Sequence, residues 1–206
     1  MSSNYEKMLS DGARIFSSKD RSIQVKRFGI PSDEDYFYPV FLGEKYRISR
    51  NNGYCEMFVQ DENKYIPANF HAAMTLYDLI CFSSDPIILS GNYTFFINLT
   101  KMQSGTSFAG KGILEDMGAI FDQKSDTELR EAMIKIGGHD WGKGDVSCEI
   151  PVFSSLNAAV SFWHSDEDFP PSLKVYTDDR ILNYMHYETV WYMVAFVLDK
   201  IKDAMS

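Results

Sequence analysis

The chain has 206 residues, of which 45% are hydrophobic and 24% are charged, and these values are ordinary for a globular protein. The formal net charge of -9 disfavours nonspecific binding to nucleic acid or to an anionic membrane surface. The length suits one sizeable core, and no repeat or linker divides the sequence. We therefore expect a single domain over residues 1–206.

The three cysteines, Cys55, Cys81 and Cys148, are scattered and form no Cys-x-x-Cys pair. We therefore expect no disulfide framework, no structural zinc and no iron–sulphur cluster held by this chain alone. The first residues lack the apolar core of a signal peptide, so the expectation is a cytoplasmic protein with reduced thiols.

The first part of the sequence predicts two helices and a hairpin. Apolar side chains recur at helical spacing in two stretches, residues 3–17 and residues 70–81. Pro67 can be the first residue of the second helix, where its missing amide costs nothing. Residues 25–30 read as a short strand or a loop. Residues 37–59 have the pattern of a β-hairpin around Asn51-Asn52-Gly53, because Asn-Gly favours a tight turn whose two central residues have positive φ.

The middle of the sequence predicts a strand followed by two helices. Residues 92–99 alternate apolar and mostly polar side chains, as in a strand with one buried face. Residues 103–112 are rich in glycine and serine and predict a flexible loop or a segment of close backbone approach, and residues 113–121 predict a helix. Another helix begins at Ser125 or Asp126 and ends at Gly137-Gly138, since glycine is common just past a helix end.

Three further strands follow a loop at residues 139–144, and they are predicted at residues 146–152, 158–163 and 173–176. A charged turn closed by two prolines, residues 164–171, separates the last two. The connections are too short for a parallel crossover, so the sheet should be antiparallel.

The last stretch, residues 182–201, is the most hydrophobic in the chain. Every residue from Val190 to Leu198 is apolar or aromatic, which predicts a helix buried on more than one side. Asp178 and Asp179 precede it and could cap its first amides. The fold class is therefore α+β, an antiparallel sheet with helices packed on it and a long buried C-terminal helix.

Several segments resemble a bacterial and archaeal family of unknown function, the domain of unknown function 3786. The most specific is the FWHSDEDFPP segment at residues 162–171, and the likeness extends over nearly the whole chain to Asn4-Tyr5, Phe41-Leu42-Gly43 and Leu89-Ser90-Gly91. The resemblance implies no established reaction and no catalytic residues. Some members of that family are joined to an iron–sulphur module like those of corrinoid one-carbon enzymes of anaerobes. That module is absent here, so the resemblance implies an iron–sulphur or corrinoid partner protein.

The densest group of ionisable residues lies in the proline-closed turn. Asp166, Glu167 and Asp168 could bind a divalent cation, and His164 could join Asp166 or Asp168 in acid–base chemistry. The alternative is a solvated turn anchored by Phe169.

The start of the last helix holds a second group. His186 and Glu188 point about 200° apart on a helix, so they cannot share one site. Either could face the acidic turn, with Tyr184 as a ligand contact nearby. The alternative is a histidine and a satisfied carboxylate at the edge of the core.

Two further residues could contact a ligand. Trp141, between two turn signals, could stack on a ligand or pack down on the sheet. Lys111, in the glycine-rich segment, could help to hold a phosphate, although the spacing does not match a nucleotide-binding loop. The first hypothesis for function is a cytoplasmic accessory or ligand-binding domain. A metal-assisted enzyme that uses residues 164–168 and a protein-interaction module remain the alternatives.

Overall fold

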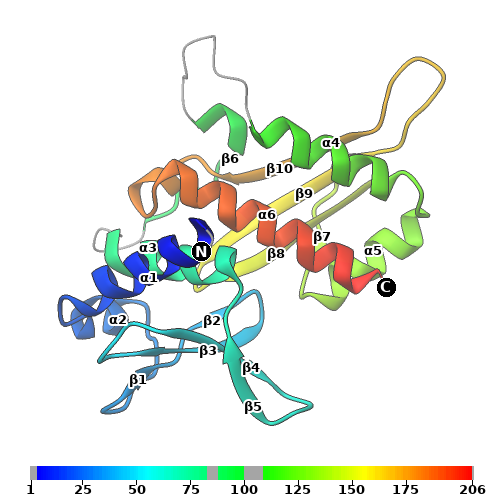
Figure 1. The fold of residues 1–206 in the computed structure, drawn as a ribbon. Coiled ribbons are helices and arrows are strands. Elements are labelled where there is room, and N and C mark those ends of the chain that lie inside the picture. Colours follow the sequence, from blue (N-terminus) through cyan, green and yellow to red (C-terminus); the bar gives the residue numbers. More distant parts are fainter. Residues whose placement is uncertain (1–3, 83–87, 100–108, 206) are drawn as a thin grey trace. The chain divides into compact units, whose positions relative to one another are not determined.

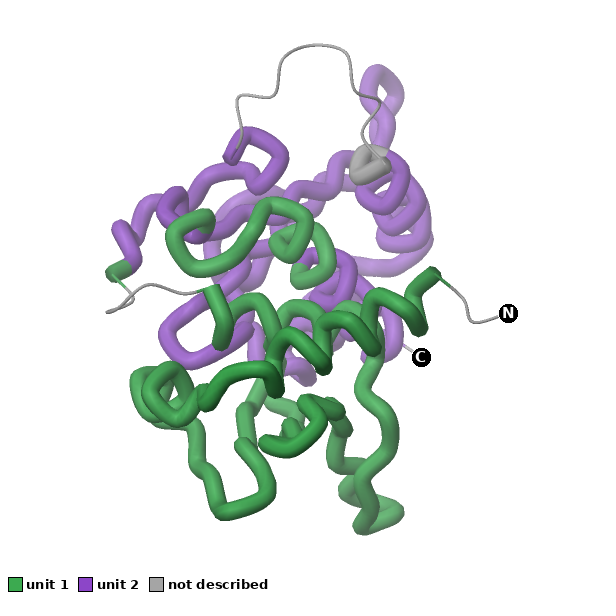
Figure 2. Tube along the Cα trace, turned by 60° about the vertical axis from the view of Figure 1, so that its left-hand side comes forward, with its two compact units in different colours: residues 1–88, 182–193 green, residues 89–181, 194–206 purple. Residues whose placement is uncertain are grey.

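The computed structural model describes residues 4–82, 88–99 and 109–205, and the side chains of residues 109–111 lie outside this description. The chain forms two compact units, residues 1–88 with 182–193 (unit 1) and residues 89–181 with 194–206 (unit 2), which Figure 2 distinguishes by colour. Each unit combines helices with an antiparallel sheet, so the predicted α+β class is confirmed. The single domain stays a prediction.

Unit 1 begins with helix α1 (Asn4–Ser17), and helix α2 (Ser22–Arg27) follows it (Figure 1). Its strands are β1 (Tyr36–Phe37), β2 (Val40–Phe41), β3 (Glu44–Ser49), β4 (Cys55–Val59) and β5 (Lys64–Pro67). They pair in the order β1-β3-β4-β5, and β2 also pairs with β3. Helix α3 (Phe70–Phe82) follows the sheet.

The predicted hairpin is confirmed as β3 and β4, where Ile48 lies opposite Cys55. Its turn differs from the prediction. Of the three turn residues only Gly53 has a positive φ, 72°, and the amide of Gly53 donates to the carbonyl of Ser49 at 2.9 Å. The connection is therefore longer than the two-residue turn that Asn-Gly suggests.

Two other local predictions were wrong. The segment read as a strand or loop at residues 25–30 contains the second half of α2, a helix too short to show a repeating apolar stripe, with Val25 its buried residue. Pro67 ends the edge strand β5, where a missing amide is tolerated. Helix α3 instead begins after Asn69, whose side-chain oxygen accepts a hydrogen bond from the amide of His71 at 2.8 Å.

Unit 2 contains the short strand β6 (Tyr93–Phe95), the 3-10 turn η1 (Phe96–Leu99) and helices α4 (Ala109–Phe121) and α5 (Asp126–Lys135). Strands β7 (His139–Asp140), β8 (Val146–Phe153), β9 (Leu156–Trp163) and β10 (Ser172–Asp178) complete it. The sheet is antiparallel throughout, in the order β6-β10-β9-β8-β7. The strand predicted at residues 92–99 is thus interrupted after Phe95, and the loop predicted at 139–144 begins as a strand.

The two faces of the unit 2 sheet differ. One face carries fully buried apolar side chains, Val146, Cys148, Ile150, Val160, Phe162 and Val175. Helices α4 and α5 pack against this sheet, and the rings of Phe121 and Phe162 lie 5.6 Å apart. The opposite face carries half-buried polar and aromatic residues such as Glu149, Trp163 and Tyr176 beside small buried ones such as Ser147 and Ser161. Helix α5 begins at Asp126 as predicted, and Ser125 and Glu128 form a capping box at its start.

Helix α6 (Tyr187–Ala204) is the predicted C-terminal helix, and it belongs to both units. Its residues 193–198 are all buried. It begins five residues later than predicted, after the 3-10 turn η2 (Ile181–Asn183). Asp178 does not cap it, because its carboxylate accepts from the amides of Gly91 and Arg180. No helix in the described ranges is both long and apolar enough to cross a membrane.

Candidate functional site

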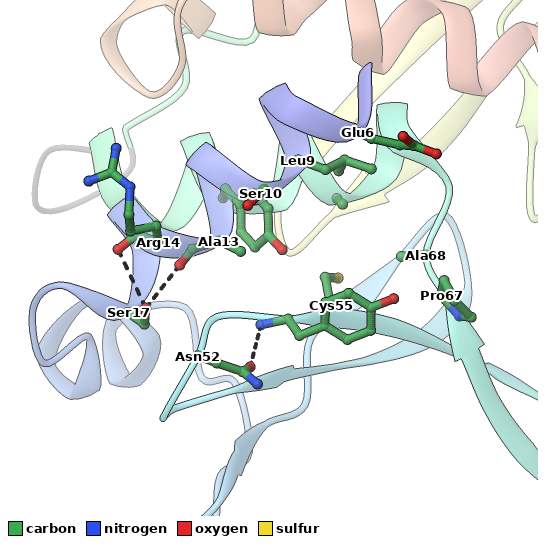
Figure 3. A pocket seen from close by; sticks show the side chains of 13 residues that line it. Glu6, Leu9, Ser10, Ala13, Arg14, Ser17, Asn52, Cys55, Pro67 and Ala68 are labelled. Atoms are coloured by element: carbon green, nitrogen blue, oxygen red, sulfur yellow. Dashed lines mark hydrogen bonds between the residues drawn. The ribbon is translucent and has the colours of Figure 1, made fainter. Parts of the chain in front are cut away.

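Unit 1 contains a cavity of about 610 Å³ between α1, the turn of the β3–β4 hairpin, the end of β5 and α3, hereafter the groove (Figure 3). Its apolar walls come from Leu9, Ala13, Cys55, Pro67, Ala68 and Ala73. Its polar lining residues are Glu6, Ser10, Arg14, Ser17, Asn52, Tyr54 and Tyr77. These positions come from four separate stretches of sequence, so only the fold brings them together.

Helix α1 forms one wall because two of its residues anchor it. Phe16 is 1% exposed, and its ring lies 5.5 Å from that of Tyr77 in α3. Gly12 lets the two helices approach, since a Cβ at this position would lie 2.9 Å from a ring carbon of Tyr77. The anchored helix then presents Leu9 and Ser10 to the groove.

The hairpin turn forms the opposite wall and contacts α1 through its backbone. Gly53 lies so close to Ala13 that a Cβ there would overlap the Ala13 carbonyl oxygen and lie 2.8 Å from the carbonyl carbon. The Tyr77 hydroxyl donates to the Gly53 carbonyl at 2.7 Å. One glycine and one tyrosine thus fix the depth of the groove.

The polar groups of the groove differ in what they already bind. Ser17 donates to the Ala13 carbonyl, and the Asn52 side-chain oxygen accepts from the Tyr54 amide. Among the described residues, none supplies a hydrogen-bond partner for the Ser10 hydroxyl or the Asn52 amide nitrogen. These two groups remain able to bind a ligand in the cavity.

The charged residues Glu6 and Arg14 lie toward opposite ends of the groove (Figure 3). They are eight positions apart on α1, which corresponds to roughly 12 Å along the helix axis. Arg14 also pairs with Asp11 at 3.3 Å, where both side chains are more than half exposed. The groove therefore has an apolar middle and polar ends.

Among the described residues that line the groove, neither the Cys55 thiol nor the Tyr77 hydroxyl is an activated nucleophile. Burial raises the pKa of the Cys55 thiol far above its usual value, so this sulfur stays protonated at neutral pH. Burial likewise raises the pKa of Tyr77, which therefore acts as a neutral hydrogen-bond donor. The arrangement suits binding better than covalent chemistry.

The acidic segment predicted as a turn forms a turn in the structure, and the carboxylate of Asp166 accepts hydrogen bonds within it. The Asp166 carboxylate accepts from the amides of Asp168 and Phe169 at 2.9 and 2.8 Å, which closes the turn on itself. Glu167 and Asp168 are exposed. The ring of His164 points to other carboxylates, Asp122 at 3.2 Å and Asp126 at 2.8 Å.

The residues predicted at the start of the last helix also have partners of their own. Asp78 of α3 accepts from both the amide and the Nδ1 of His186, at 2.7 and 2.8 Å, and supplies the cap that α6 needs. Glu188 accepts from the Tyr192 hydroxyl at 2.5 Å. Tyr184 is buried, and its hydroxyl bonds to the amide and the carbonyl of Ile88. The structure thus gives His186 and His164 separate aspartate partners, each within its own unit.

The two remaining ligand candidates lie in unit 2. Trp141 packs against Tyr176 and Tyr93, at ring distances of 5.1 and 5.5 Å, and Lys143 lies 4.1 Å above its ring. It therefore packs down on the sheet, which was the alternative to ligand stacking. Lys111 falls in α4, and its side chain lies outside the described residues.

Metal binding by the acidic turn receives no support from the geometry. Within the described ranges, no three His, Cys, Asp or Glu side chains are grouped so that they could hold a metal ion. The proposed ligands Asp166, Glu167 and Asp168 therefore stay a prediction.

Comparisons with known proteins place the sequence in one family. The model of a family described as Domain of unknown function (DUF3786) matches residues 22–200. No curated protein and no solved structure matches the chain.

Proposed function

The chain belongs to the family of domain of unknown function DUF3786, and within it we propose that this protein binds a small organic ligand in the groove of unit 1. The observation that carries the proposal is a cavity with an apolar middle and unpaired polar groups on its walls. Its volume of about 610 Å³ falls in the range of small-molecule sites.

The lining favours an uncharged and largely apolar ligand. A charged group in the apolar middle, beside Leu9, Ala13 and Ala73, would lose its hydration without gaining a counter-ion. A hydroxyl or amide on the ligand would pair with Ser10 or Asn52.

Nile red, an uncharged dye that brightens in apolar surroundings, tests the groove directly. We expect saturable binding to the wild-type protein and at least a tenfold loss of affinity in Ala68→Trp, because the indole would fill the cavity. Ala119→Trp, at an exposed position of α4 in the other unit, is the matched control and should bind as the wild type does. Equal binding by both variants would exclude the groove as the site.

The natural ligand can be sought by native mass spectrometry of protein purified from its own host without oxygen. A mass released from the wild type and missing from Ala68→Trp would identify it. The same preparation tests the proposed link to anaerobic redox or corrinoid metabolism, which rests on the family resemblance. That link predicts an iron–sulphur or corrinoid protein that co-purifies.

A further inference from the structure

Unit 2 has a cavity of its own beside the loop that joins β9 and β10, which extends beyond the strands in Figure 1. Its volume is about 590 Å³. Its apolar walls come from the loop, Phe169, Pro170 and Pro171, and its polar groups include Asp145, Asp166 and Lys174. No residue of this cavity lines the groove of unit 1.

Lys174 gives the cavity a cation that has no carboxylate partner. Its Nζ lies 5.0 Å from the centroid of the Trp163 ring, and both residues are half-buried. In the described part of the chain, no acidic group forms an ion pair with it. A half-buried ammonium held over an indole can still pair with an anionic ligand group, and little side-chain entropy is lost because the lysine is already positioned.

Asp166 contributes to the same cavity a carboxylate whose second oxygen can still accept a hydrogen bond. Its Oδ1 accepts both turn amides, which fixes the carboxylate in place. The other oxygen, Oδ2, accepts no hydrogen bond from any described residue. Asp145 is oriented in a similar way, through Oδ2, by the amide of His164 at 2.9 Å.

The apolar residues of the cavity are exposed at Phe169. Phe169 is 69% exposed, although a phenylalanine side chain gains free energy from burial. Pro170 and Pro171 follow it and restrict the backbone of this part of the lining. An apolar ligand group would cover this surface.

We propose that this cavity binds a zwitterion of amino-acid size with an apolar side chain. The ligand carboxylate pairs with Lys174, its ammonium group pairs with the free oxygen of Asp166, and its side chain packs on Phe169 and the prolines. A simple anion would meet the two aspartates, and a simple cation would meet Lys174. A ligand that carries both charges satisfies both sets of groups.

Three probes that share a phenyl ring separate the contributions. Phenylalanine carries both charges, phenethylamine carries only the cation, and 3-phenylpropionate carries only the anion. Binding is followed by NMR at the side-chain N–H of Trp163, one of three tryptophans in the chain. We expect phenylalanine to bind at least fivefold more tightly than either analogue, since each charge contributes one charge-assisted hydrogen bond even in a largely exposed site.

Two variants assign the charges to residues. Lys174→Met should weaken the binding of phenylalanine by about tenfold and leave the affinity for phenethylamine unchanged or higher. Asp166→Asn retains the oxygen that accepts the turn amides but removes the charge, and it should weaken phenylalanine and phenethylamine alike. Lys135→Met, at an exposed position of α5, is the control for loss of a positive charge.

Three outcomes would overturn the proposal: equal affinities for the three probes, no shift of the Trp163 signal up to about 10 mM ligand, or unchanged phenylalanine binding in Lys174→Met. Circular dichroism confirms that each variant is folded. The Nile red measurement on the groove is independent, because it reports on residues of unit 1 only.

Discussion

Replacing Gly53 by alanine tests the contact that shapes the groove. Gly53 has a φ of 72°, and an alanine in this left-handed region costs about 1 kcal/mol. The added Cβ would also overlap the carbonyl oxygen of Ala13, and a helix backbone cannot give way as a side chain can. The hairpin must therefore move off α1, which costs about 2 kcal/mol of packing. The hydrogen bond from Tyr77, about 1 kcal/mol, would be lost as well.

The expected loss is therefore about 4 kcal/mol, a large share of the 5–15 kcal/mol by which domains are typically stable. Urea unfolding followed by circular dichroism measures it. Gly43→Ala is the matched control, since Gly43 has nearly the same φ, 74°, but no atom within 4 Å of the added Cβ. It should cost only about 1 kcal/mol. If the two variants are equally stable, the hairpin turn does not lie against α1 and the groove has another shape.

Three further substitutions test other contacts. Asp78→Ala removes both hydrogen bonds to His186 and should destabilise the protein by about 1–2 kcal/mol in urea unfolding, whereas a neutral result would mean that Asp78 does not cap α6. Ser125→Ala breaks the capping box of α5 and should cost about 1 kcal/mol by the same measurement, and a loss below about 0.3 kcal/mol would contradict it. The hydrogen bond from the Tyr93 hydroxyl is the main cause that lowers the pKa of Glu149 in the folded protein. The ionised Glu149 carboxylate therefore stabilises the fold above its unfolded-state pKa, and this stabilisation is lost as the pH falls through its folded-state pKa. The stability difference between wild type and Glu149→Gln should thus shrink below about pH 4.5, and a difference that is constant with pH would refute this.

The secondary structure was predictable where a local pattern decides it. Residues 146–152 alternate because the apolar side chains of β8 lie on one buried face, and the C-terminal helix shows as an apolar run because its residues 193–198 are all buried. The capping box of α5 was visible as Ser125 with Glu128 three positions later. The prediction at Pro67 was wrong because the end of an edge strand tolerates proline as well as the start of a helix does. Helix α2 was missed because six residues are too few to show a helical period.

The candidate sites were less predictable because their partners are distant in sequence. His186 and Asp78 are 108 residues apart, and His164 lies 42 and 38 residues from Asp122 and Asp126. Nothing in the local pattern of either histidine indicates these pairings. The groove has the same origin, although Gly12 inside a helical stripe and Gly53 in a turn were signs of close backbone approach that sequence reasoning could have used.

The histidine pairs bear on whether this protein acts by binding or by catalysis. Among the interactions of the described residues, His139, His164 and His186 bond to carboxylates, and Glu149, Asp122 and Asp78 each also accept a second hydrogen bond. Glu149 accepts hydrogen bonds from His139 and Asn157, and Asp122 accepts from His164 and Ser165. Asp78 accepts from the ring and the backbone amide of His186.

These hydrogen-bonded clusters join loops to neighbouring helices and strands, and the carboxylate oxygens of the clusters accept the hydrogen bonds that make these connections. Other polar groups of the described residues keep unused hydrogen-bonding capacity, among them the Ser10 hydroxyl in the groove and, in the second cavity, the Lys174 ammonium and the Oδ2 of Asp166. Because the residues best suited to acid–base chemistry are bound within the fold while the cavities present these polar groups, the arrangement favours the ligand binding that we propose over catalysis.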